Sequence, residues 1–173
     1  MEQHEFSEPV IAIDNAGLVI LHRFLLPLFE NLNWCKGIVW RTDECRNKAV
    51  LATQFLVTGK QEYDTTALAL NKMICGFSAD QSIDTTILLS KKEMEACREL
   101  LAAVISYWTN LNNCAIETLQ EHYLQRAGKI LERNGQTQLW LEKRPIDMLL
   151  ENIPWSIHLI KTPWMPVLLH SHW

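Results

Sequence analysis

The chain has 173 residues, of which 48% are apolar and 21% are charged, and its formal net charge is −4. This composition is typical of one globular domain and excludes an intrinsically disordered chain. The basic residues are scattered, and no apolar run reaches the ~18 residues that a bilayer span needs. We therefore expect no nucleic-acid binding and no membrane span.

Cysteine usage indicates the redox compartment. The chain has five cysteines, none of them in a C-x-x-C pair. The segment Met1–Pro9 is acidic and polar, and lacks the apolar core of a signal peptide. We therefore expect reduced, buried thiols in a cytosolic protein.

The first half of the chain is predicted to begin with a lead-in segment, residues 1–14, that contains a short strand at Val10–Ile13. Apolar residues at helical spacing then predict helices. The predicted helices are Leu18–Leu32, broken or kinked at Pro27, Glu44–Val57, ended by Gly59, and Thr66–Cys75, ended by Gly76. The connection Asn33–Asp43 carries Trp34 and Trp40.

The second half starts with the clearest helix signal. Ser90 and Glu93 have the spacing of a capping box, and apolar residues then recur at helical spacing up to Trp108. A break is expected at Asn110–Asn113. The later predicted elements are a helix at Ala115–Gln125, strands at Lys129–Arg133 and Gln138–Glu142 around an Asn134-Gly135 type I′ turn, one or two helical turns at Ile146–Glu151, and a third strand at Ser156–Lys161.

These elements predict an α+β fold. A helical N-terminal two thirds precedes a small antiparallel β-sheet and an extended Trp-rich tail at Ile153–Trp173. We expect residues 15–173 to form a single domain.

Motifs for phosphate binding or nucleophilic catalysis are missing from the sequence. It contains neither G-x-x-x-x-G-K nor G-x-S-x-G. His170 and His172 could hold a metal on one face of a strand, but zinc sites usually show paired ligands that this chain lacks. We therefore predict no metal and no cofactor, and interpret the two histidines as polar side chains of the tail.

An enzyme would need titratable groups gathered in a cleft, and the candidates are His22, His158, Asp147 and Glu151. Asp147 has a simpler interpretation as the salt-bridge partner of Arg144 around the turn at Pro145. No pattern favours catalysis, so no catalytic residue is predicted.

The tail contains two Pro-Trp units and ends in a third tryptophan. Proline fixes φ and makes the preceding residue extended, so each indole is presented from a stiff backbone. Such side chains suit a protein interface. The predicted partner-binding residues are Pro154, Trp155, Pro163, Trp164, Met165 and Trp173. In the alternative interpretation, the indoles pack on the domain's own sheet.

Several sequence patches, in order along the chain, carry a family resemblance. They are Asn15-Ala16-Gly17-Leu18-Val19, Leu70-Asn71-Lys72, Leu124-Gln125-Arg126, Arg144-Pro145-Ile146-Asp147, Pro154-Trp155-Ser156-Ile157 and Pro163-Trp164-Met165-Pro166. Together they resemble the C-terminal domain of contractile injection system tape-measure proteins, which belong to phage-tail-like machines. The resemblance covers nearly all of Asn15–Trp173.

The resemblance implies a structural, non-enzymatic protein at the junction of the inner tube with the baseplate hub and spike, where it would nucleate tube assembly. The implied partners are inner tube and baseplate hub/spike proteins. The implied location is cytoplasmic during assembly and then within the injection particle. A homo-oligomer, such as a trimer on a threefold spike, stays open.

Length favours an anchoring role over a measuring role. A fully helical chain of 173 residues would span at most roughly 260 Å, and a globular one far less. The alternative function is a soluble assembly chaperone or adaptor for tube or hub subunits, absent from the finished particle.

Overall fold

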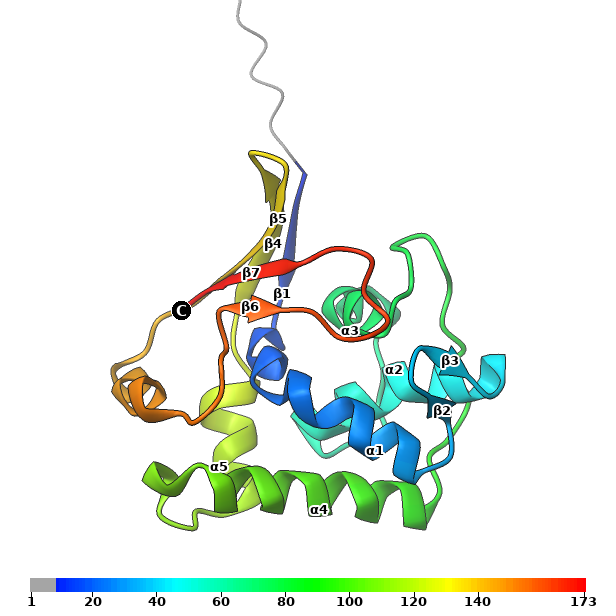
Figure 1. Ribbon diagram of the computed structural model, residues 1–173, viewed down its shortest axis with the longest axis horizontal. Coiled ribbons are helices and arrows are strands. Elements are labelled where there is room, and N and C mark those ends of the chain that lie inside the picture. The colour runs from blue at the N-terminus through cyan, green and yellow to red at the C-terminus, as the bar shows by residue number, and fades with distance from the viewer. Residues whose placement is uncertain (1–8) are drawn as a thin grey trace, which may run out of the picture.

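The computed structural model describes residues 9–173, so most of the predicted lead-in, residues 1–8, lies outside the described residues. A helical layer occupies most of the first two thirds of this range (Figure 1). Its elements are the α-helices α1 (Leu25–Asn31), α2 (Asp43–Thr58), α3 (Ala69–Ile74), α4 (Lys91–Tyr107) and α5 (Ile116–Leu119), the 3₁₀ segments η1 (Ala16–Phe24), η2 (Thr65–Ala67) and η3 (Thr109–Leu111), and the π-helical turn η4 (Gln120–Leu124). A further 3₁₀ segment, η5 (Pro145–Asn152), lies in the last third of the chain.

Local hydrogen bonds explain where the two longest helices begin and end. At the start of α4, Ser90 Oγ accepts the Glu93 N–H at 3.1 Å and the Glu93 carboxylate accepts the Ser90 N–H at 2.8 Å, which confirms the capping box. At the start of α2, the Thr42 Oγ1 atom accepts the Cys45 N–H at 3.0 Å, and Gly59 ends that helix with φ +71°. The predicted helices at 44–57 and after Ser90 are therefore confirmed.

The predicted break near Pro27 falls slightly earlier. The chain changes from the 3₁₀ segment η1 to α1 at Leu25. Pro27 then occupies the first turn of α1, where its missing N–H needs no partner in the helix. The segment is thus two helical pieces, as expected, with the proline just inside the second.

Five strands form one sheet in the order β1-β4-β5-β7-β6. They are β1 (Val10–Ile13), β4 (Gly128–Arg133), β5 (Gln136–Leu141), β6 (Leu159–Ile160) and β7 (Leu169–His172). Asn134 and Gly135 both have positive φ between β4 and β5, which confirms the type I′ hairpin. β1 pairs with β4, so part of the predicted lead-in belongs to the sheet. The division into residues 1–14 and 15–173 stays a prediction.

The sheet is mixed, so the prediction of a purely antiparallel sheet is wrong. β7 lies parallel to β5, with Leu139 opposite Ser171. Residues 142–168 separate the two strands, which is a long enough connection for a parallel crossover. The predicted strand at 156–161 shrinks to β6, because the carbonyls of Ser156 and Ile157 accept hydrogen bonds from the side chains of His22 and Trp173.

A second, two-stranded sheet lies in the predicted connection at 33–43. β2 (Cys35–Lys36) and β3 (Val39–Trp40) form a short hairpin around Gly37, which has φ +59°. Figure 1 shows this hairpin at the end of α1, far from the larger sheet.

A largely buried polar cluster lies where the start of η1 meets α2 and α3. Asn15 donates to the side chains of Asn71 at 2.6 Å and Gln54 at 2.9 Å, and Asn71 donates to Thr53 at 2.9 Å. Beside it, η1 touches η4 so closely that a Cβ on Gly17 would lie 1.7 Å from the Tyr123 carbonyl oxygen. These contacts give the Asn15-Ala16-Gly17 and Leu70-Asn71-Lys72 patches a structural role.

Candidate functional site: an apolar groove beside the Trp-rich tail

Trp155 is built into the domain core. Its side chain is 7% exposed, and its Nε1 donates to the Ile20 carbonyl at 2.8 Å. Its ring meets Phe24 edge-on, with centroids 5.0 Å apart. The predicted partner-binding side chain is therefore mostly covered by its own domain, and its neighbours include residues of η1 and α4.

Trp164 joins an aromatic cluster on the small hairpin. Its ring stacks on Trp40 at 4.8 Å and lies 5.5 Å from Phe29, which also contacts Trp34. Its Nε1 donates to the Gly37 carbonyl at 3.2 Å. The tail is thus packed against the tryptophans of the 33–43 connection.

Trp173 covers a buried cation. Its ring centroid is 5.3 Å from the Arg126 guanidinium, which is fully buried and forms an ion pair with Asp147. The predicted Arg144–Asp147 salt bridge is therefore wrong. The Arg126 guanidinium is desolvated in the core, so it pairs with the nearby Asp147 carboxylate through Oδ1. Asp147 Oδ2 accepts the backbone N–H of Arg144 at 3.0 Å, so the contact with Arg144 is to its main chain.

The remaining predicted tail residues differ in exposure. Met165 is buried, and its sulfur accepts the Thr162 N–H. Pro154 and Pro163 are exposed. The structure therefore distributes the six residues over several places in the fold, and their partner-binding role stays a prediction.

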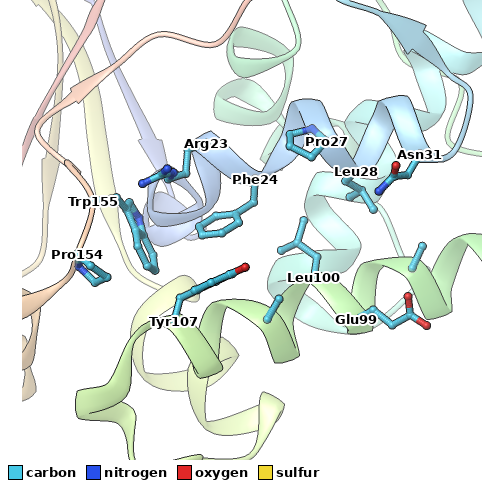
Figure 2. Close-up of a pocket in the computed structure, with 12 residues that line it drawn as sticks. Arg23, Phe24, Pro27, Leu28, Asn31, Glu99, Leu100, Tyr107, Pro154 and Trp155 are labelled. Carbon is cyan, nitrogen blue, oxygen red and sulfur yellow. The ribbon is translucent and has the colours of Figure 1, made fainter.

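An apolar groove of about 740 Å³ runs between the η1–α1 segment and α4 (Figure 2). Its volume is in the range of ligand and peptide sites. Pro154 and Trp155 close one end, so the tail shapes this surface. The lining residues are Arg23, Phe24, Pro27, Leu28, Asn31, Ala96, Glu99, Leu100, Ala103, Tyr107, Pro154 and Trp155.

The two ends of the groove differ in chemistry. At one end Tyr107, which is 64% exposed, stacks on Phe24 with centroids 6.1 Å apart, and Arg23 lies over the same Phe24 ring at 5.9 Å. At the other end Glu99 lies below Asn31, as Figure 2 shows. An aromatic, cationic end and an anionic end therefore share one apolar floor.

The groove was not predicted from the sequence. The apolar face that was predicted for this helix ends in Trp108, which the structure buries in the core. Ala96, Leu100, Ala103 and Tyr107 form a second face at helical spacing. That spacing could have revealed the face, but only the tertiary structure brings η1 and α1 beside it.

The structure does not gather the groups that an active site would need. Asp147 is paired with Arg126, while His158 and Glu151 are exposed. Burial lowers the pKa of His22, whose Nε2 donates to the Ser156 carbonyl at 2.8 Å.

His170 and His172, the candidate metal ligands, have no further ligands grouped with them in the part of the chain that the structure describes. Between residues 9 and 173, no cluster of three His, Cys, Asp or Glu side chains could hold an ion. His172 instead stacks on Trp140 at 4.0 Å. The five cysteines are free, and burial raises the pKa of Cys35 to about 11 and of Cys97 to about 12, which keeps these thiols protonated.

A family model described as contractile injection system tape measure protein matches residues 2–173. The chain belongs to this family. The tape measure proteins of contractile injection systems are structural components of the machine. No curated protein and no solved structure gives a significant match to the chain. Among residues 9–173 of this tape measure protein, no helix is both long and apolar enough to cross a bilayer.

Proposed function

We propose that this tape measure protein anchors the inner tube at the baseplate hub or spike and nucleates tube assembly there. The observation that carries the proposal is the open apolar groove between η1–α1 and α4. Its floor combines Leu28, Leu100 and Phe24 with the exposed Tyr107. An exposed aromatic beside a concave apolar floor is typical of the centre of a protein interface.

The tail supports this function indirectly. The Trp155 indole forms the closed end of the groove while its Nε1 bonds to η1. A partner seated in the groove would therefore touch the indole edge and the exposed Pro154 ring. The tail then shapes the docking surface and contributes one side of it.

Deleting the tail does not test this proposal, because β6, β7 and the core residue Trp155 belong to it. Loss of folding and loss of docking would look alike. The sharper variant is Tyr107→Lys, which adds a charge to the groove through an exposed side chain. Leu88→Lys is the matched control, because Leu88 is 65% exposed and does not line the groove.

The readout is the amount of this chain in purified injection particles, measured by mass spectrometry, with tube length and particle number from electron microscopy. We expect Tyr107→Lys to reduce both chain incorporation and particle number, and Leu88→Lys to leave them unchanged. Normal particles with normal tubes from Tyr107→Lys would contradict the anchoring role. Normal assembly with the wild-type chain absent from finished particles would favour the assembly chaperone instead.

The proposal includes a location and partners. The chain would be cytoplasmic during assembly and then become part of the particle, in contact with inner tube and hub/spike proteins. Whether one copy or several occupy the baseplate is read from the same mass spectrometry as the ratio of this chain to the spike protein.

A further inference from the structure

We infer that the groove binds an amphipathic helix of a neighbouring subunit, with a carboxylate near Arg23 and a basic side chain near Glu99. The inference rests on the proposed function and names the partner of the same site. It follows from the walls, the length and the charges of the groove.

The groove walls favour a helix over an extended segment. Both long sides are helical, formed by η1–α1 and α4. The backbone groups of helical walls are bonded within their own helices, so an extended occupant would bury unpaired N–H and C=O groups against them. A helix satisfies its own backbone and presents only side chains.

The floor has the shape that a helix requires. Ala96 and Ala103 lie seven positions apart on α4, about 10 Å along the helix axis, and their small side chains allow a close approach. From Ala96 to Tyr107 the groove follows α4 for about 16 Å, which is the length of about three helical turns. An occupant with apolar residues at positions i, i+3, i+4 and i+7 would fill this floor.

The charges at the two ends of the groove determine where the occupant carries its acidic and basic residues. Arg23 lies at the end of the groove that Tyr107 and Trp155 line (Figure 2). Glu99 lies at the opposite end, near Asn31. Both charged side chains are exposed. The distance from Glu99 to Tyr107 along α4 is about 12 Å, so the occupant's basic and acidic residues should be about eight positions apart.

Photo-crosslinking in assembling particles tests the inference. The variants Ala96→p-benzoylphenylalanine and Ala103→p-benzoylphenylalanine place the probe on the floor. Ala102→p-benzoylphenylalanine is the control, because Ala102 is exposed on another face of α4. Thermal melting of each purified chain verifies that it folds, and mass spectrometry identifies the crosslinked residues.

We expect the two floor probes to react with one partner segment at residues about seven positions apart, since a helix rises ~1.5 Å per residue. An extended segment rises ~3.3 Å per residue and would give about three positions, which would overturn the inference. Products only with a second copy of this chain would also overturn it. So would folded floor probes that give no more product than the Ala102 control in particles that retain the chain.

A charge variant adds a second readout. Glu99→Lys should lower the Ala103 crosslinking yield about fivefold by opposing the basic residue of the occupant. Glu95→Lys, which changes an exposed carboxylate of α4 outside the groove, should leave it unchanged. Equal yields in the two variants would contradict the predicted charge pattern. Loss of the wild-type chain from all particles would instead contradict the anchoring function, so the two failures are distinguishable.

Discussion

The indole of Trp155 donates its Nε1 hydrogen to the carbonyl oxygen of Ile20, and the two heavy atoms are 2.8 Å apart. This bond joins the Trp-rich tail to η1 near the start of the domain. The same indole lines one end of the groove, so this side chain contributes both to the stability of the domain and to the shape of the proposed docking surface.

Replacing Trp155 should separate its two contributions to stability. Trp155→Ala removes a buried indole and should lower the free energy of unfolding by about 3–5 kcal/mol. Trp155→Phe keeps most of the packing but loses the bond to Ile20, and should cost about 1–2 kcal/mol. Urea unfolding followed by tryptophan fluorescence measures both. A Trp155→Phe variant as stable as the wild type would show that the hydrogen bond contributes nothing.

Gly76 should be much less tolerant of a side chain than Gly37. Both have positive φ, so alanine costs about 1–2 kcal/mol at either position. A Cβ on Gly76 would also lie 2.5 Å from the Trp164 carbonyl oxygen, while nothing lies within 4 Å of one on Gly37. This clash should make Gly76→Ala less stable than Gly37→Ala by about 1–3 kcal/mol. Thermal unfolding should therefore give Gly76→Ala the lower melting temperature. Equal melting temperatures would mean that the tail is not held against Gly76.

The buried ion pair should matter far more than the exposed one. Asp147→Asn leaves the buried Arg126 guanidinium without its anion and should cost about 3–5 kcal/mol of folding free energy. Glu142→Gln removes an exposed partner that lies 3.8 Å from Arg144, and should cost less than about 1 kcal/mol. Chemical denaturation of the two variants provides the comparison. A small loss from Asp147→Asn would contradict the buried pairing.

Acid should weaken the domain through His22. Burial lowers its pKa, Arg23 lowers it further, and the bond to the Ser156 carbonyl opposes both. The unfolded chain therefore binds the proton first, and the free energy of unfolding should fall as pH drops from about 6.5 toward the lower folded pKa. His22→Gln should flatten this part of the profile. Parallel pH profiles for the variant and the wild type would remove His22 as the cause.

Filling the groove should block assembly without unfolding the domain. Ala103→Phe places a ring on the partly exposed floor, so we expect a normal melting temperature but fewer particles that contain the chain. Ala102→Phe adds the same ring on another face of α4 and should assemble normally. The measurements are differential scanning fluorimetry and mass spectrometry of particles. Equal incorporation of both variants would show that the groove is not the docking surface.

The local elements were predictable from the sequence because their causes lie within a few residues. Ser90 and Glu93 bond to each other's backbone, Gly59 ends α2, and Asn134-Gly135 supplies two positive φ angles for the hairpin. The family resemblance was readable for the same reason, since its patches are short and continuous. The family match over residues 2–173 confirms it.

Contacts between distant segments were decided only by the tertiary structure. Nothing local to Asp147 indicates that it pairs with Arg126, and nothing in Leu169–His172 fixes a parallel register against β5. The groove is formed jointly by η1, α1, α4 and the tail. It depends on the contact between Trp155 and Ile20, which are 135 positions apart in the sequence. Burial and ion pairing stabilise contacts between segments that are distant in the sequence. Short-range sequence patterns therefore do not predict which segments will meet.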